Sequence, residues 1–291
     1  MRDTDELPSA PLAVTVPAIA AGLAYLNAKG AVGYDYHLVT SFLSGDFRAR
    51  WRELKDRISL FYILEEAALN PTTADRVYLI FEGRSWTYKQ TYGMALKYGT
   101  WLKTHHDVKP KEIVAMEFAN SEIFMFMWLG LWAIGARPAF LNYNLTGKAL
   151  GHCVKVSTAR LVIVDPAFEE SITDELKGDL PGVEFVTFKP EIEARAESIE
   201  PVRSPDQDRS EDKTRNIALL IYTSGTTGLP KPAIVSWLKC IIISEFSHRW
   251  MGLKHPDIFY TVSLVAKKSS HYPNNYSVCP YTIPLRPSLV L

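Results

Sequence analysis

The chain has 291 residues, 47% of them hydrophobic and 22% charged, which is the composition of a folded protein and not of a disordered one. Its 32 basic and 32 acidic residues balance, which argues against a nucleic-acid partner held by overall charge. Cys153, Cys240 and Cys279 are widely spaced and form no C-x-x-C pair, so neither a zinc ribbon nor a disulfide framework is expected. We predict no metal ligands among the side chains and expect a reducing compartment.

The N-terminal residues 1–35 form a hydrophobic segment with no charged residue between Glu6 and Lys29. The length is just sufficient for a membrane-spanning helix, although Pro11 and Pro17 weaken that interpretation. A helix lying on the protein surface or docked on the domain is the alternative. The basic cluster at 48–57 follows the segment, and by the positive-inside rule it would place the body of the protein in the cytosol.

The apolar spacing of Leu54, Ile58, Phe61 and Leu64 predicts one amphipathic helix from Trp51 onward. Its basic face is typical of a solvated surface and could also contact an anionic membrane.

The next elements alternate between strands and helices. We predict a hairpin from strands 77–81 and 85–88, a helix at 90–105 and a buried strand at 112–116. Residues 123–134 are apolar on every face and predict a fully buried helix that ends at Gly135, with Trp128 and Trp132 in the core. Further elements are expected as a strand at 138–141, a helix at 146–156, and strands at 159–165, 217–222 and 233–236.

This alternation predicts an α/β fold with mixed, mostly parallel sheets flanked by helices. Residues 189–216 interrupt it, because they are rich in acidic residues and proline and have little to bury. We interpret them as a solvated connector within one domain.

The run Tyr222–Lys231, YTSGTTGLPK, carries the chemistry. Gly225 and Gly228 allow the backbone to approach a ligand closely, and successive N–H groups in such a turn form an anion-binding concavity. Lys231 adds a positive charge. The hydroxyls come from four residues: Thr223, Ser224, Thr226 and Thr227. Together these groups suit a triphosphate.

The run is not a Walker A loop, which requires G-x-x-x-x-G-K-[ST] and a helix immediately after it. Here Pro230 and Pro232 prevent a helix from starting, and a strand is expected instead. A turn without a ligand would need one or two glycines, but not the hydroxyls and the lysine as well.

The same run resembles the signature loop of the adenylate-forming, AMP-binding superfamily. The resemblance extends from about Trp86 to Tyr260 and includes Gly135-Ala136-Arg137-Pro138, which matches a "G-A-x-P" turn. Residues 140–145 and 150–153 resemble the very-long-chain acyl-CoA synthetase and fatty acid transport protein group, especially its fungal members. The implied fold is the N-terminal domain of an adenylate-forming enzyme.

The resemblance implies a ligase that uses ATP with Mg²⁺ and coenzyme A to convert a long- or very-long-chain fatty acid into its acyl-adenylate and then its acyl-CoA. No general base is expected, since a fatty carboxylate is ionised near neutral pH. It further implies a membrane-associated protein with a cytosol-facing domain, at the endoplasmic reticulum, peroxisome, lipid droplet or plasma membrane. The residues implied to hold the β- and γ-phosphates are Thr223, Ser224, Gly225, Thr226, Thr227, Gly228 and Lys231.

Family members are about twice as long, and the resemblance ends near Thr261. We therefore expect residues 36–261 to form a partial AMP-binding domain, and residues 262–291 to be an irregular, divergent tail of out-of-frame or intron-derived sequence. The 291-residue chain by itself is expected to release no pyrophosphate. Two alternatives stay open: an adenylate-forming ligase for an aromatic or amino acid, and a truncated, non-catalytic membrane-associated protein that binds lipid or a partner.

Overall fold

The computed structural model describes residues 12–30, 32–223, 228–250, 260–261 and 277–278. Its first elements are helices α1 (Leu12–Gly30), α2 (Val32–Leu54) and α3 (Phe61–Leu69). Strands β1 (Val77–Phe81) and β2 (Arg84–Thr87) form the expected antiparallel hairpin, turned by Glu82 and Gly83, which both have positive φ.

The remaining elements continue the alternation of helices and strands, and they include two helices and a strand within 174–198 that were not predicted. They are α4 (Tyr88–His105), β3 (Ile113–Glu117), α5 (Glu122–Ala133), β4 (Arg137–Phe140), α6 (Gly147–Ser157), β5 (Leu161–Val164), the 3₁₀ helix η1 (Pro166–Ser171), α7 (Asp174–Asp179), β6 (Glu184–Thr187), α8 (Pro190–Ser198), the 3₁₀ helix η2 (Asp206–Arg209), β7 (Ile217–Thr223), β8 (Lys231–Ser236) and α9 (Trp237–Trp250). Two short strands, β9 (Tyr260–Thr261) and β10 (Ser277–Val278), pair antiparallel to each other.

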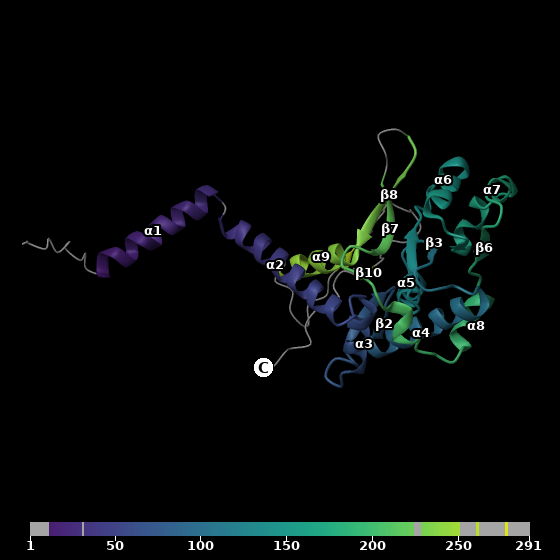
Figure 1. Ribbon diagram of the computed structural model, residues 1–291, viewed down its shortest axis with the longest axis horizontal. Helices are drawn as coiled ribbons and strands as arrows, with labels where there is room; N and C mark the ends of the chain where they lie inside the picture. Colours follow the sequence, from purple (N-terminus) through teal and green to yellow (C-terminus); the bar gives the residue numbers. More distant parts are fainter. Residues whose placement is uncertain (1–11, 31, 224–227, 251–259, 262–276, 279–291) are drawn as a thin grey trace, which may run out of the picture.

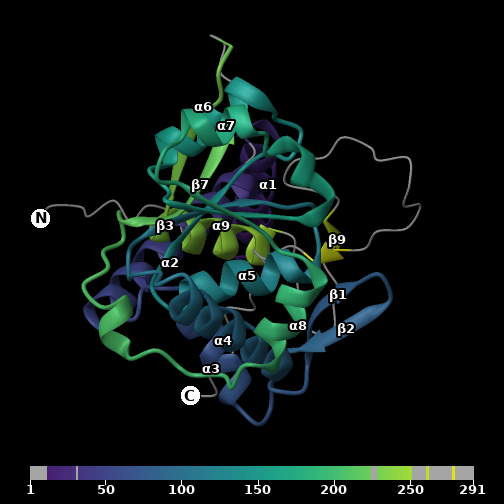
Figure 2. The same cartoon turned by 90° about the vertical axis from the view of Figure 1, so that its right-hand side faces the viewer.

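The main sheet of the described residues has the order β6-β5-β3-β4-β7-β8. Every neighbouring pair is parallel except β7 and β8, which form an antiparallel hairpin. Helices α4, α5 and α8 cover one face, and α6 and α7 cover the other (Figure 2). The predicted α/β class, with a mostly parallel sheet flanked by helices, is confirmed.

Local sequence signals explain the central helices. Thr87 and Gln90 form a reciprocal capping box that starts α4. Helix α5 is buried as predicted, and Trp128 and Trp132 are almost completely enclosed. Gly99 and Gly130 let α4 and α5 approach closely, because a Cβ on Gly99 would lie 2.8 Å from the Gly130 carbonyl oxygen.

Two expectations were wrong. The single helix predicted from Trp51 to Leu64 is divided, since α2 ends at Leu54 and the backbone takes a positive φ at Asp56 before α3 begins. The connector at 189–216 is not simply solvated, because it contains α8 and η2 and buries Ala196, Arg209 and Asp212. Its polar residues find partners on the folded domain, which local composition does not reveal.

Helices α1 and α2 form an arm that extends from the sheet domain (Figure 1). Among the described residues, no helix combines the length and apolarity needed to cross a membrane.

Candidate functional site

The predicted phosphate loop joins β7 to β8. Thr223 ends β7 and Lys231 starts β8, and their Cα atoms are paired across the hairpin. The Thr223 hydroxyl donates a long hydrogen bond of 3.5 Å to the Lys231 carbonyl oxygen, so both exposed side chains are at the mouth of the loop. The loop ends of β7 and β8 point away from α3 and α4 (Figure 1).

Gly228 also fits the predicted turn, because its φ of +98° is a conformation that side-chain-bearing residues rarely adopt. Four of the predicted site residues lie outside the described residues: Ser224, Gly225, Thr226 and Thr227. Their hydroxyl and backbone contributions stay a prediction. The structure therefore brings Thr223, Gly228 and Lys231 together in one hairpin.

Tyr222 anchors the end of β7. Its hydroxyl donates to the backbone carbonyl oxygen of Cys153 on α6 at 2.9 Å. Burial raises the pKa of Tyr222 to about 12, so the phenol stays protonated and keeps this bond at physiological pH. The hydrogen bond fixes the strand from which the loop departs.

A buried carboxylate lies at the same side of the sheet, where the parallel strands end, which we call the carboxyl edge. It was not singled out in the sequence. Glu117 ends β3 and is completely enclosed. Ser171 donates to its Oε2 at 3.0 Å, whereas Oε1 has no hydrogen-bond partner among the described residues. Burial raises the pKa of Glu117 to about 7; the Ser171 hydrogen bond opposes this shift and Asp165 adds to it. A charged residue at the end of an otherwise apolar strand was the available sequence signal.

Aromatic side chains border this edge. Tyr143 follows β4 and Phe168 lies in η1, and their rings stack with centroids 4.8 Å apart and an interplanar angle of 13°. Ligands of open parallel sheets bind outside the carboxyl ends of the strands, where strand order reverses. Here the chain runs from β3 to β4 on one side and then crosses back to β5 on the other. The hairpin loop, Glu117 and the aromatic pair thus share the edge at which a ligand is expected.

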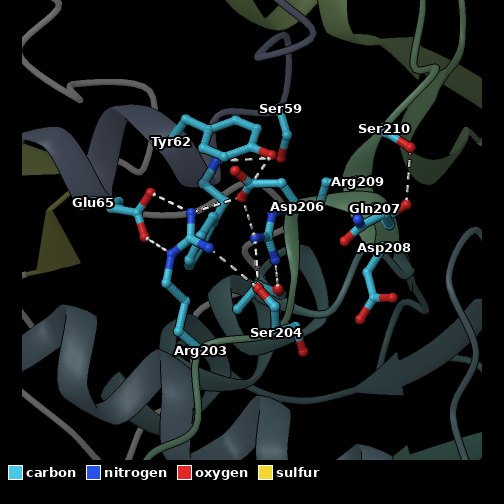
Figure 3. A network of polar contacts seen from close by, with 12 residues as sticks. Ser59, Tyr62, Glu65, Arg203, Ser204, Asp206, Gln207, Asp208, Arg209 and Ser210 are labelled. Carbon is cyan, nitrogen blue, oxygen red and sulfur yellow. Dashed lines mark hydrogen bonds and ion pairs between the residues drawn. The ribbon is translucent and has the colours of Figure 1, made fainter.

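The opposite side of the sheet, where the parallel strands begin, is the amino edge. Its polar groups are largely paired with one another. Arg203 forms a fork with the Glu65 carboxylate and also contacts Asp206 (Figure 3). Arg209 is fully buried, lies over the rings of Phe61 and Tyr62, and donates to Ser204 and Ala133 carbonyl oxygens. These contacts fasten the 201–212 segment to α3 and to the end of α5.

A second buried pair lies beside this network. Arg137, at the start of β4, donates to both carboxylate oxygens of Asp212 at 2.7 and 2.6 Å. Burial lowers the pKa of Arg137, and the Asp212 carboxylate opposes that shift. Gly135 lies next to the pair with a φ of +79°, where a Cβ would come within 1.9 Å of the Asp208 carbonyl oxygen. The sequence motif Gly135-Ala136-Arg137-Pro138 is therefore structural, since it closes the amino end of the sheet.

Comparison with known families identifies the class of protein. Residues 64–264 match the AMP-binding enzyme family model. The chain belongs to this family, whose members include acyl-CoA ligases that use ATP and coenzyme A.

The curated relatives show which members of the family the chain resembles. A very long-chain fatty acid transport protein of Cochliobolus heterostrophus is 32% identical over 280 residues, covering 93% of this chain and 43% of the relative. The Saccharomyces cerevisiae protein of the same description is 37% identical over 169 residues, which cover 55% of this chain and 25% of the yeast protein. The predicted resemblance to the fungal fatty acid transport group is confirmed. The chain spans less than half the length of these relatives.

Solved structures support the fold. The o-succinylbenzoate CoA synthetase of Bacillus subtilis superimposes with a TM-score of 0.56 at 18% identity, over 68% of this chain and 38% of that chain. The N-terminal subdomain of Klebsiella oxytoca NpsA superimposes with a TM-score of 0.52 at 22% identity, over 64% of this chain and 44% of that chain. The expected N-terminal adenylate-forming fold is confirmed.

Proposed function

We propose that this protein takes part in the ATP-dependent activation of long- or very-long-chain fatty acids. In the first step a carboxylate oxygen attacks the α-phosphorus of ATP, the bond to pyrophosphate breaks, and acyl-adenylate forms. In the second step the sulfur of coenzyme A attacks the acyl carbonyl carbon, AMP leaves, and the thiol proton passes to solvent. Family membership and the fungal fatty acid transport relative support this proposal.

The observation that carries it is the pairing of Thr223 with Lys231 at the mouth of the β7–β8 loop. Charge develops on the departing pyrophosphate, and donors already aimed at that position lower the barrier. We assign the β- and γ-phosphate contacts to the two paired residues and to Gly228 and the loop between them, which is made of Ser224, Gly225, Thr226 and Thr227.

Mg²⁺ is expected to enter the site as a companion of the nucleotide. No group of three or more His, Cys, Asp or Glu side chains within the described ranges is arranged as a metal site. Mg²⁺ commonly keeps several waters and binds through substrate phosphates with one or two carboxylates. We therefore propose that it arrives as MgATP and neutralises phosphate charge there.

The proposed location is a membrane surface, with the sheet domain in the cytosol. The descriptions of the fungal and yeast relatives as fatty acid transport proteins support it. Fatty acids partition into bilayers, so an activating domain held at that surface would meet its substrate where it is concentrated.

The phosphate site is tested by calorimetric titration of the 291-residue chain with MgATP and with pyrophosphate. Lys231→Ala should weaken both ligands, whereas Lys89→Ala, an exposed lysine on α4, serves as the matched control and should leave them unchanged. Equal affinity in wild-type protein and Lys231→Ala would overturn the assignment.

The class of carboxylic acid that serves as substrate is tested in cells that carry or lack the gene. Acyl-CoA synthesis is measured from oleate and from a 24-carbon fatty acid. Deletion should reduce the fatty acyl-CoA products. If deletion instead abolishes activation of benzoate or of an amino acid, the other adenylate-forming ligase is correct. If the chain binds no nucleotide and deletion changes no ligase activity, the non-catalytic alternative replaces the proposal.

A further inference from the structure

Helix α2 presents two faces of opposite character. Small residues on its inner face, Ser41, Gly45 and Ala49, are buried against the sheet domain. A Cβ on Gly45 would lie 3.0 Å from the Ile242 side chain of α9, so the two helices are in direct contact there. Arg48 forms an ion pair with Glu245 of α9 on the same side.

Leu38 and Phe42, each 53% exposed, lie on the side of Ser41 and Gly45. The other exposed bulky apolar residues of α2 lie on its outer face. They recur every three or four positions, which places them on one side of a helix, opposite the buried small residues. Their exposed fractions range from 52% to 83%. We call this set the outer stripe: Tyr36, Val39, Leu43, Phe47, Trp51 and Leu54. An ordinary surface helix of a globular domain buries such residues and exposes its small ones.

Helix α1 precedes α2 along the arm (Figure 1), and its apolar side chains are exposed as well. Val14, Ile19, Leu23 and Tyr25 are each about 60% exposed and occupy several sides of the helix. A folded partner protein would cover one side of α1. A fluid lipid phase can contact α1 on several sides and can also contact the outer stripe of α2. Continuity between the two helices therefore favours lipid over a second copy or another protein.

A lysine just after α2 lies beside the outer stripe. Four cations of residues 46–57 are held in ion pairs, Arg50 with Asp46 and Arg48, Arg52 and Arg57 with acids elsewhere in the domain, whereas Lys55 forms no ion pair among the described residues. The Lys55 ammonium lies over the Trp51 ring, 4.7 Å from its centroid. Such an aromatic–lysine pair suits the interface, with the ring at the headgroup level and the ammonium near lipid phosphates.

We propose that the outer stripe of α2 docks on an anionic lipid surface, with α2 parallel to the bilayer and its apolar side chains at the headgroup–acyl boundary. The inner face of α2 then holds α9, and through it the sheet domain, beside the membrane. This inference rests on the membrane association proposed above and adds the surface that makes the contact.

Vesicle co-sedimentation of the full chain tests the proposal. Wild-type protein should bind phosphatidylcholine vesicles that contain phosphatidylserine more tightly than phosphatidylcholine alone. The double variant Leu43→Glu/Phe47→Glu should lose at least about tenfold in vesicle affinity, because two apolar anchors are replaced by charges that anionic lipid repels. The matched control is Leu69→Glu/Val202→Glu, which changes two exposed apolar residues away from the arm and should bind as wild type.

Two further measurements separate the outcomes. Pyrophosphate titration and thermal unfolding of the α2 variant should match those of wild type, so a fold defect or a failed phosphate site is recognised independently. Undiminished vesicle binding by the α2 variant would overturn the proposal, as would loss of binding only in Leu23→Glu/Leu26→Glu on α1. A wild-type dimer in light scattering that becomes monomeric in the α2 variant, without vesicle binding, would assign the stripe to a second copy.

Discussion

The two edges of the main sheet use charged and hydroxyl side chains in opposite ways. At the amino edge, Arg137 and Asp212 satisfy each other in a dry environment, and Arg209 is buried between rings and carbonyl oxygens. At the carboxyl edge, Lys231 is exposed, and Glu117 keeps one buried oxygen without a partner in the described part of the chain. At the first edge folding pairs Arg137 with Asp212 and leaves Arg209 Nε without a partner in the described part of the chain, whereas the second edge exposes Lys231 and keeps a carboxylate oxygen of Glu117 unpaired.

Buried pairs at the amino edge and exposed groups at the carboxyl edge differ in how much they contribute to stability. A buried ion pair is costly to break because the remaining charge stays desolvated, so the amino edge holds the 201–212 segment in one position. Exposed groups at a strand end contribute little to stability and remain free to meet a ligand. Substitutions at the two edges should therefore separate stability from binding.

The largest expected effect is at the amino edge. Asp212→Ala should lower the free energy of unfolding by about 3–5 kcal/mol, because it leaves the Arg137 guanidinium buried without its carboxylate. Urea denaturation measures this change. The control Lys109→Ala, in an exposed pair with Asp107, should cost less than about 1 kcal/mol. Similar costs for both variants would remove the proposed difference between buried and exposed pairs.

The next effect is on binding at the carboxyl edge. Lys231→Ala should weaken pyrophosphate about tenfold to a hundredfold, since one charge-assisted contact is lost. Its urea midpoint should stay close to that of wild type because the side chain is exposed. A large loss of stability with unchanged affinity would reverse the roles given to the two edges.

Glu117 should give the protein a pH dependence. Its pKa of about 7 in the folded state lies above the unfolded value of 4.5, so the folded state holds the proton more tightly and stability falls as pH rises from about 4.5 through 7. Glu117→Gln should abolish this fall and raise the free energy of unfolding at pH 8 by about 1–3 kcal/mol. Urea denaturation at pH 5.5 and pH 8 measures it. Glu191→Gln on the surface of α8 is the control, and a fall that persists in Glu117→Gln would assign it to another group.

The smallest stability effect is expected at Thr223. Its hydrogen bond to Lys231 is long and exposed, so Thr223→Ala should change the free energy of unfolding by less than about 1 kcal/mol. The same variant should weaken pyrophosphate binding measurably by calorimetry. Thr223→Ser retains the hydroxyl and should restore it; failure of this rescue would argue against a hydroxyl contact.

Much of the fold could be predicted from periodicity and turn residues. The run at 123–134 is apolar throughout, and its burial followed from composition alone. The 201–212 segment was misjudged because Arg209 is buried by Phe61 and Tyr62, which are far away in the sequence. The division of the helix at Asp56 depends on a local backbone conformation that apolar spacing does not encode.

For the candidate site, the sequence supplied a hypothesis about one loop. The glycines, hydroxyls and Lys231 are adjacent in the sequence, so a local motif was sufficient to propose them. Glu117, Ser171 and the Tyr143–Phe168 pair belong to separate strand ends and meet only once strand order is fixed. The strand order β6-β5-β3-β4-β7-β8 was the missing information.

The most direct test of the central claim is an amide NMR titration of the 291-residue chain with pyrophosphate. The largest shift changes should fall at Thr223, Gly228 and Lys231 on the carboxyl edge, and Arg137 and Asp212 on the amino edge should remain unchanged. Shift changes centred on the amino edge, or none at the β7–β8 loop at saturating pyrophosphate, would contradict the assignment of this hairpin as the phosphate site.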